Sequence, residues 1–436
     1  MSINFFKGHP TRSLLPVQAI ANAYNKVLLD SDYLSYETDP LNQHPLQYGT
    51  DPGNYDVRKS IAQWTDKRFG RTSSGNGKGT DPDTINLTAG ASYGVANILT
   101  SVTEASTVTK RAFIVTPTYY LITSSFLDTG FEGKLTAINE TPDEEYEIDL
   151  KTLEEKLIEY GHGLESSEGK EINIIRDPVR GDRKLYRFVL YIVPTFSNPG
   201  GLSYSEKTRV KLIEIARKYD LLVISDDVYE FLDYTDSKYP IPRLVHLDQD
   251  TLPPYKKYGN TISNGTFSKL IAPGLRVGWQ ETPTTKFADQ LAITGANRSG
   301  GTPGQLASLV VQHLINDGEL DKIILDFVKV YKSRSIAIQE SIKKYLPKST
   351  RVLGGQGGYF LWVTIPGIED HTLIVKELAK NGVTLAGGEN FEVAGDTRDW
   401  GRNSVRLSLS YLPEEELRLG IKLWGKVLQE KHPELY

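Results

Sequence analysis

A lysine close to two hydroxyl residues and an arginine is the strongest chemical signal in the chain. Thr266, Ser268, Lys269 and Arg276 occur within Asn264 to Trp279, which reads NGTFSKLIAPGLRVGW. A lysine amine can attack an aldehyde to form a Schiff base, while a guanidinium and hydroxyls can bind a phosphate. The segment therefore carries the groups needed to hold a phosphorylated aldehyde. Taken alone, its charges are equally well explained as surface residues beside a strand.

A second signal is an acidic segment that follows an apolar run. SDDVYE begins at Ser225, directly after Leu221 to Ile224. Asp226 is therefore expected at the carboxyl end of a buried strand, where open α/β sheets bind ligands. A carboxylate beneath a pyridine ring keeps the ring nitrogen protonated, and the Tyr229 hydroxyl can reach a ring phenolate. The alternative is a helix-capping aspartate and a half-buried packing tyrosine.

Two glycine-containing turns follow other apolar runs. VPTFSNPGG, at residues 193–201, places Asn198 in a turn that can direct its amide inward, although ordinary turn chemistry also explains it. LTAGASYGVANI, at residues 87–98, is expected to pass from a strand into a helix, so that the backbone amides of Ala91 and Ser92 point toward an anion. Neither stretch matches a nucleotide-binding loop.

The elements expected around these residues indicate an α/β fold. Short β-branched runs alternate with helical patterns, which is typical of a mostly parallel sheet flanked by helices. Strands are expected at Ile85 to Thr88, Ala112 to Thr116, Tyr186 to Val193, Leu221 to Ser225, Thr261 to Ser263 and Arg276 to Trp279. The clearest helix lies between Gly201 and Leu221, with Ser205 as its N-cap.

The last third of the chain has a different pattern. Helices are expected at Leu306 to Asn316, Leu320 to Tyr345, Thr372 to Asn381 and Pro413 to Lys431, and extended segments at Gly357 to Val363 and Ser404 to Ser408. We therefore expect an N-terminal arm at residues 1–45, a large α/β domain at 46–315 and a small α+β domain at 316–436. Two polar stretches, Arg71 to Asp83 and Gly161 to Glu171, are expected to be exposed loops.

Composition narrows the functional classes. The 436 residues include no cysteine, which excludes disulfides, thiolate metal sites and cysteine nucleophiles. A net charge of −5 gives no basic field for nucleic-acid binding. No apolar run reaches the roughly 18 residues that a membrane span needs, and we see no signal or transit peptide, so the expected location is the cytoplasm.

Histidine patterns argue against two further classes of enzyme. The seven histidines are dispersed and form no H-E-x-x-H motif, so we expect no metal site. A Ser-His-Asp hydrolase is disfavoured because the chain has no G-x-S-x-G motif.

Taken together, these segments resemble the fold type I family of pyridoxal-phosphate enzymes, specifically class I/II aminotransferases of the 2-aminoadipate and aromatic branch. The resemblance begins with GHPTRSLLP at Gly8 and continues through LQYGTDPGNYDVRKSIAQW at 46–64. It closes with GGYFLW at 357–362 and VRLSLS at 405–410, so it covers nearly the whole chain. It implies a mostly parallel, seven-stranded sheet flanked by helices, a smaller α+β C-terminal domain, and pyridoxal 5'-phosphate as cofactor.

The resemblance also implies a role for each candidate residue. Lys269 would form the Schiff base and later move the proton, Asp226 would pair with the pyridinium, and Tyr229 and Asn198 would bind the ring phenolate. The groups implied for the phosphate are the amides of Ala91 and Ser92 with the side chains of Thr266, Ser268 and Arg276.

Four further residues receive implied roles. Tyr119 resembles the aromatic residue that stacks on the cofactor, and Tyr48 resembles the tyrosine that reaches the cofactor of a neighbouring subunit, which implies a homodimer. Arg406, with Asn198 beside it, would bind the substrate carboxylate, and Arg12 is a candidate for a second carboxylate. Core packing is the alternative for the tyrosines, and a structural ion pair is the alternative for Arg406.

The implied reaction moves an amino group between an α-amino acid and a 2-oxo acid such as 2-oxoglutarate. A 2-aminoadipate, aromatic or similar medium-length side chain is expected on the donor. Three alternatives remain: a lyase or decarboxylase on the same cofactor, a cofactor-binding transcriptional regulator, and a non-catalytic cofactor-binding protein. The regulator is disfavoured because the resemblance begins by Gly8 and leaves no room for a DNA-binding domain. Retention of Lys269, Asp226 and Arg406 argues against the non-catalytic protein.

Overall fold

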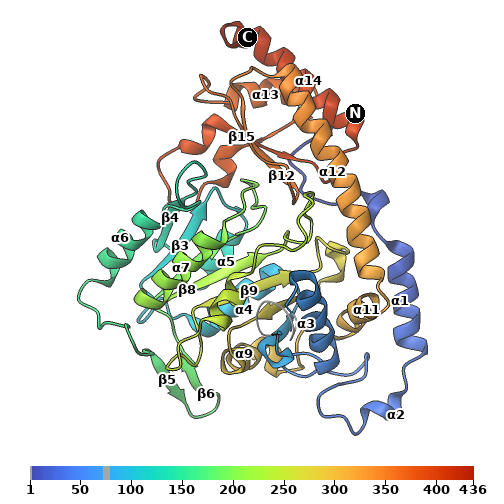
Figure 1. Cartoon of the computed structure of the whole chain (residues 1–436), viewed down its shortest axis with the longest axis vertical. Coiled ribbons are helices and arrows are strands. Elements are labelled where there is room, and N and C mark those ends of the chain that lie inside the picture. The colour runs from blue at the N-terminus through green and yellow to red at the C-terminus, as the bar shows by residue number, and fades with distance from the viewer. Residues whose placement is uncertain (1, 72–78) are drawn as a thin grey trace.

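Two β-sheets lie at different ends of the molecule in the computed structural model, which describes residues 2–71 and 79–436 (Figure 1). The long helix α12 (Glu319–Tyr345) extends from the region of the small sheet toward the large one. Most of the loop expected at 71–83, namely residues 72–78, lies outside the described residues. The stretch at 161–171 is mostly exposed and forms no strand.

The larger sheet has seven strands in the order β2-β10-β9-β8-β7-β3-β4. Their bounds are β2 (Ile85–Thr88), β3 (Arg111–Thr116), β4 (Leu135–Asn139), β7 (Phe188–Ile192), β8 (Leu221–Asp227), β9 (Thr261–Thr266) and β10 (Gly278–Glu281). Only β10 pairs antiparallel with its neighbours. The prediction of a mostly parallel seven-stranded sheet is confirmed.

Both faces of this sheet are covered by helices. Along β8, Leu222 and Ile224 belong to one buried cluster with residues of α4, whereas Leu221 and Val223 belong to another with residues of α6, α7 and α8. The helices are α4 (Ala91–Val102), α5 (Ile122–Asp128) and α9 (Thr285–Ala292), with α6 (Leu150–Gly161), α7 (Glu206–Tyr219) and α8 (Leu244–Asp250). Because successive side chains of a strand point to opposite faces, consecutive residues of β8 enter different environments.

The α7 helix begins as its sequence predicts. The hydroxyl of Ser205 accepts a hydrogen bond from the Thr208 amide at 3.4 Å. Leu212, Ile213 and Ala216 are buried, so one face of the helix packs on the sheet.

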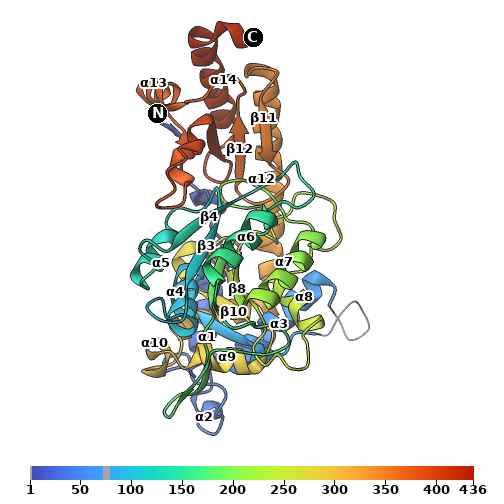
Figure 2. The ribbon, with the colours of Figure 1, turned by 90° about the vertical axis from the view of Figure 1, so that its left-hand side faces the viewer.

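The smaller sheet is antiparallel and has four strands, β11 (Arg351–Gly354), β12 (Phe360–Thr364), β15 (Ser404–Ser408) and β14 (Ala386–Gly387). Helices α13 (Thr372–Lys380) and α14 (Glu414–Lys431) lie at this end of the molecule. The N-terminal strand β1 (Ile3–Asn4) pairs with β13 (Val383–Thr384), so the first residues join the C-terminal part of the chain (Figure 2).

The remaining elements surround the large sheet. They are helices α1 (Val17–Leu29), α2 (Tyr33–Tyr36), α3 (Tyr55–Phe69), α10 (Gly295–Arg298) and α11 (Gln305–Asn316), and the hairpin of β5 (Ile174–Asp177) and β6 (Gly181–Lys184). A strand was predicted from Arg276 to Trp279, and this prediction is wrong for Arg276 and Val277. A 3₁₀ turn over Pro273–Leu275 leaves Arg276 at a left-handed φ of 53°, and β10 begins only at Gly278.

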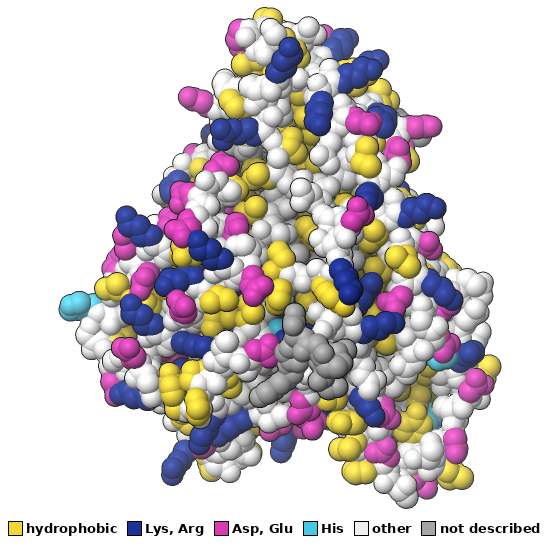
Figure 3. All heavy atoms as spheres, viewed as in Figure 1, with side chains coloured by type: hydrophobic (Ala, Val, Ile, Leu, Met, Phe, Trp, Pro, Cys, Tyr) yellow, Lys and Arg dark blue, Asp and Glu magenta, His cyan; other side chains and the backbone are white. Residues whose placement is uncertain are grey.

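Within residues 2–71 and 79–436, no helix combines the length and the apolar composition needed to cross a bilayer. On the face seen in Figure 3, positive and negative side chains are intermixed over the described atoms, and neither sign forms a continuous patch there.

Candidate active site

A cavity of about 320 Å³ lies at the carboxyl end of β8 and brings most of the candidate residues together. Those that line it are Ala91, Ser92, Tyr119, Asn198, Asp226, Tyr229, Thr266, Ser268, Lys269, Arg276 and Arg406. They come from both sheets and from the turns between them. The topology therefore places widely separated motifs of the sequence around one space.

Asp226 enters this cavity from β8 and is buried there. Its Oδ2 atom accepts a hydrogen bond from the Tyr191 hydroxyl at 2.7 Å, and its Oδ1 atom accepts one from the Asn264 amide at 2.8 Å. Burial raises the pKa of the Asp226 carboxyl to about 6, although both hydrogen bonds and the charge of Lys269 lower it. The carboxylate can therefore stabilise a cation placed beside it.

Lys269 follows β9 and is only partly exposed. Burial, together with the charges of Arg406 and Arg276, lowers the pKa of its amine to about 8, although the charge of Asp226 raises it. Its Nζ atom lies 5.4 Å from the centre of the Tyr359 ring and, among the described residues, takes part in no hydrogen bond or ion pair. A buried amine that is partly neutral near pH 8 is suited to nucleophilic attack.

The anion-binding groups lie around the start of α4. Gly90 has a φ of 94° and precedes Ala91, the first residue of the helix, so the first amides of α4 lack partners within the helix. Arg276 donates to the Ala89 carbonyl at 2.8 Å and to the Ser268 hydroxyl at 3.4 Å. The Thr266 and Ser268 hydroxyls are 3.0 Å apart. The helix N-terminus, the guanidinium and the hydroxyls thus converge on one place for a phosphate.

Arg406, on β15, is a buried cation without an acidic partner in the described part of the chain. Its side chain lies between the rings of Phe360 and Phe391, whose centres are 4.3 and 4.6 Å from the guanidinium carbon. It donates to the Asn198 side-chain oxygen at 2.9 Å and to the Phe6 carbonyl at 2.5 Å, but its buried Nε has no partner. Because an unpaired buried charge is costly, this geometry favours a bound carboxylate.

Two predicted residues lie elsewhere. Tyr48 is 80% exposed, and Arg12 is exposed in a short 3₁₀ turn; neither is among the described residues that line the cavity. Lys7 and His9 were not predicted from the sequence, and they line the cavity because the N-terminal segment runs beside β15. Burial and the charge of Lys269 lower the pKa of His9. No local motif marks these residues, since their position depends on contacts across about 400 positions.

Tyr191 and Asn264 were also not identified from the sequence. Both lie within expected or observed strands, where a tyrosine or an asparagine is indistinguishable from an ordinary core residue. Their contacts with Asp226 become visible only when the strands are aligned in the sheet.

Comparisons with known proteins agree with this arrangement. The family model described as aminotransferase class I and II matches residues 13–422. The chain is 43% identical over 432 residues to an uncharacterized protein of Saccharomyces cerevisiae, covering 98% of this chain and 96% of that protein. It is 28% identical over 438 residues to aromatic-amino-acid aminotransferase 1 of Thermococcus litoralis, covering 98% and 88%. The solved structure of a Pyrococcus horikoshii kynurenine aminotransferase is similar with a TM-score of 0.76 at 27% identity, covering 99% and 91%.

Proposed function

Because this chain belongs to the aminotransferase class I and II family and is a pyridoxal-phosphate-dependent transaminase, we propose that it transfers the amino group of an aromatic or medium-length α-amino acid to a 2-oxo acid such as 2-oxoglutarate. In this proposal, Lys269 is the residue to which the cofactor is covalently attached. The observation that carries it is the meeting, in a single cavity, of Lys269 and Arg406, two cations that no described carboxylate pairs with.

The groups in the cavity match the parts of pyridoxal 5'-phosphate. The phosphate would be held by the amides of Ala91 and Ser92 and by Thr266, Ser268 and Arg276. Asp226 would face the ring nitrogen, Tyr119 would cover one face of the ring, and Tyr229 and Asn198 would bind the phenolate oxygen. Tyr229 is buried and makes no side-chain hydrogen bond within the described residues, so its hydroxyl is available to such a ligand.

The side chains of this chain divide the work of the reaction. When bound, the cofactor supplies an aldehyde carbon that exchanges amines and a ring that accepts an electron pair. Arg406 binds the substrate carboxylate and so fixes the orientation of the α-carbon. The Lys269 amine removes the proton from the α-carbon and holds it for return, while the negative charge of Asp226 favours a protonated ring nitrogen. The same site serves donor and acceptor, so ping-pong kinetics are expected.

The walls of the cavity favour an aromatic donor. Phe6, Tyr119, Tyr120 and Phe360 line it and supply flat apolar surface. A substrate with a second carboxylate needs another cation, for which the position of Arg12 gives no support. We assign that role to Lys7, since it lines the cavity and its side chain is exposed.

We further propose a homodimer, because Tyr48 is exposed on the protomer and packs against Gly300 rather than against the cavity of its own chain. A second copy would bring this tyrosine to the neighbouring cofactor phosphate. We also propose that the chain divides into residues 1–45, 46–315 and 316–436, and that the protein is cytoplasmic. Sedimentation of the purified protein tests the dimer, and Tyr48→Phe in a dimer should weaken cofactor binding.

A panel of amino acids tests the proposed function directly. The protein with pyridoxal phosphate should absorb near roughly 420 nm, and productive donors should convert this band to one near roughly 330 nm. Addition of 2-oxoglutarate should then restore the first band and yield glutamate. Pyruvate and ammonia without glutamate would instead indicate a lyase.

The lysine to which the cofactor is attached can be identified in a separate experiment. Borohydride reduction followed by digestion and mass spectrometry should place the cofactor on Lys269. Attachment to any other lysine would overturn the assignment, whatever the donor panel shows.

A further inference from the structure

The Asp226 carboxylate is held from both sides by residues on the neighbouring strands. In the register of the sheet, Asn264 of β9 lies directly beside Asp226 of β8. On the other side, Tyr191 of β7 pairs with Ile224, two residues before Asp226 and therefore on the same face. The Tyr191 hydroxyl and the Asn264 amide each donate to a different oxygen of the carboxylate, at 2.7 and 2.8 Å.

Asn264 makes a second contact that reaches the phosphate-binding turn. Its Nδ2 atom donates to Asp226 and also, at 2.9 Å, to the carbonyl of Ala91 at the start of α4. One side-chain amide thus bridges the carboxylate assigned to the ring nitrogen and the turn assigned to the phosphate.

The packing around Asn264 is specific for this arrangement. A Cβ atom on Gly94, one turn into α4, would lie 1.9 Å from Asn264 Oδ1 and 3.0 Å from its Cγ. Only glycine therefore allows α4 to approach the amide closely enough for the bond to Ala91. The Oδ1 atom has no hydrogen-bond partner, so both donor hydrogens, rather than the carbonyl oxygen, make the contacts that hold this side chain.

We propose that Asn264 and Tyr191 are positioning residues that keep Asp226 ionised and fix its distance from the phosphate-binding turn. The proposal rests on the proposed function, because it assumes a ligand whose ring nitrogen and phosphate lie at opposite ends of one rigid molecule. Such a ligand binds best when both partners are held in place before it arrives.

The electrostatic part of this role follows from the burial of Asp226. Burial favours the neutral acid, whereas donors to its oxygens favour the carboxylate. Each carboxylate oxygen accepts one protein hydrogen bond and retains capacity for another, which leaves room for a ring N–H. Loss of either donor should therefore lower the negative charge available to the ring nitrogen and with it the pKa of that nitrogen.

Two pairs of variants separate positioning from stability. Asn264→Ala and Tyr191→Phe remove the donors to Asp226. Asn97→Ala and Tyr186→Phe are the matched controls, because Asn97 donates to the Leu291 carbonyl at 3.2 Å and Tyr186 donates to the Gly259 carbonyl at 2.6 Å, and both are buried.

The readouts are the dissociation constant of pyridoxal phosphate, from quenching of tryptophan fluorescence in the apo-enzyme, and the pH titration of the bound chromophore. Asn264→Ala should weaken cofactor binding by about tenfold or more, and Tyr191→Phe should shift the chromophore titration with a smaller effect on affinity. kcat should fall in both variants with little change in KM. The controls should lower the melting temperature without moving either cofactor readout.

A double-mutant cycle decides whether the effect passes through Asp226. In an Asp226→Asn background, Tyr191→Phe should no longer shift the chromophore titration. Asn264→Ala should still weaken cofactor binding in this background, but only by the part of its effect that comes from the lost bond to Ala91. Gly94→Ala should reproduce the Asn264→Ala phenotype, since the added methyl displaces the amide. Equal shifts with and without Asp226, or equal effects of variants and controls, would overturn the proposal. A wild-type protein that forms no chromophore would instead refute the proposed function.

Discussion

Asp226 and Asp227 are adjacent on β8 yet belong to two different kinds of buried polar region. Asp226 faces the cavity that contains Lys269 and Arg406. Asp227 points to the other side of the strand, where its oxygens accept hydrogen bonds from Ser225 at 2.8 Å and Ser263 at 2.6 Å. Both side chains are less than 10% exposed, so burial alone does not distinguish them.

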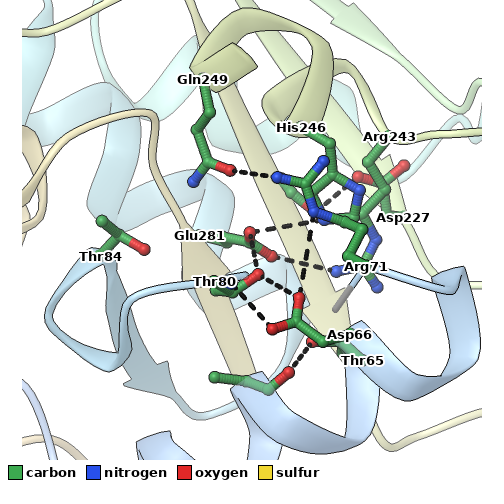
Figure 4. A network of polar contacts seen from close by, with 12 residues as sticks. Thr65, Asp66, Arg71, Thr80, Thr84, Asp227, Arg243, His246, Gln249 and Glu281 are labelled. Atoms are coloured by element: carbon green, nitrogen blue, oxygen red, sulfur yellow. Dashed lines mark hydrogen bonds and ion pairs between the residues drawn. The ribbon is translucent and has the colours of Figure 1, made fainter. Parts of the chain in front are cut away.

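The region near Asp227 is a closed network of charges (Figure 4). Arg243 is 1% exposed, contacts Glu230, and lies 3.3 Å from Glu281. Its guanidinium carbon also lies 5.1 Å from the ring centre of Phe69. At the edge of the network, Arg71 pairs with Asp250 at 3.0 Å. Each of these cations therefore has an acidic partner within the chain.

The difference between the regions lies in the partners of the charges. In the network, the cost of burying a cation is offset by an anion that the fold itself supplies. In the cavity, Arg406 retains a buried donor without an acceptor, and Lys269 makes no hydrogen bond within the described residues. The absence of a carboxylate partner, rather than burial, distinguishes the two cations of the cavity from those of the network. Four experiments test this difference between the cavity and the network.

The largest effect is expected for Lys269 in comparison with Lys184. Lys184 is 1% exposed and contacts Asp220 at 2.5 Å, whereas Lys269 has no such partner. Lys269→Ala should lower turnover by about 10⁴-fold or more, because it removes both the nucleophile and the proton carrier. Lys184→Met should leave the turnover of folded enzyme unchanged but lower the melting temperature, since it strands a buried Asp220. Turnover assays and thermal melts of both variants measure this contrast, and a fully active Lys269→Ala enzyme would contradict it.

A smaller effect is expected for the adjacent aspartates. Asp226→Asn should lower kcat by about 10²- to 10³-fold, because the ring nitrogen loses its anionic partner. Burial, with the charge of Glu230, raises the pKa of Asp227. Its carboxyl faces away from the cavity and accepts hydrogen bonds from Ser225 and Ser263, so Asp227→Asn should change kcat little. Equal losses of kcat in the two variants would show that the two faces of β8 do not differ in function.

The third comparison is between Arg406 in the cavity and Arg243 in the network, and its expected effect is smaller. Arg406→Lys keeps the charge but loses the planar pair of donors, so KM for the amino acid should rise by about tenfold to a hundredfold with a small change in melting temperature. Arg243→Lys should show the reverse, because losing the guanidinium fork weakens the contacts with two acids inside the core. Steady-state kinetics and melting curves are again the measurements. A rise in KM for Arg243→Lys alone would place the substrate outside the cavity.

Elements and local motifs could be predicted from the sequence because they depend on nearby residues. The strand at Ser404–Ser408 was predicted with its observed bounds, and Asp226 lies where the apolar run before it indicates. The start of α4 at Ala91 follows from the glycine before it. The strand β4 was not predicted, because Leu135–Asn139 is only partly buried.

Contacts that depend on sheet register could not be predicted in this way. The bonds from Tyr191 and Asn264 to Asp226 require knowledge of which strands are neighbours and how they align. The carbonyl of Phe6 reaches Arg406 only because β1 pairs with β13 at the other end of the chain. These partners decide which charges are satisfied, so a motif alone could not separate the two regions.

The smallest effect concerns the pH at which the cavity lysine reacts. Only a neutral amine attacks an aldehyde, and burial lowers the pKa of Lys269 from 10.5 to about 8. The rate at which apo-enzyme recombines with pyridoxal phosphate should therefore rise by about tenfold per pH unit below 8 and level off above it, whereas an ordinary lysine would level off only near 10.5. Stopped-flow absorbance measures this rate.

The charged neighbours of Lys269 determine the direction in which two substitutions should shift the midpoint of this pH dependence. Arg406→Gln removes a positive charge that lowers the pKa of the amine, so the midpoint should move to higher pH. Asp226→Asn removes a negative charge that raises it, so the midpoint should move to lower pH. Arg243→Gln, in the closed network, serves as the control and should leave the midpoint in place. Opposite shifts from Arg406 and Asp226, with none from Arg243, would show that the charges of the cavity act on one another and on the amine, whereas those of the network are neutralised by their own partners.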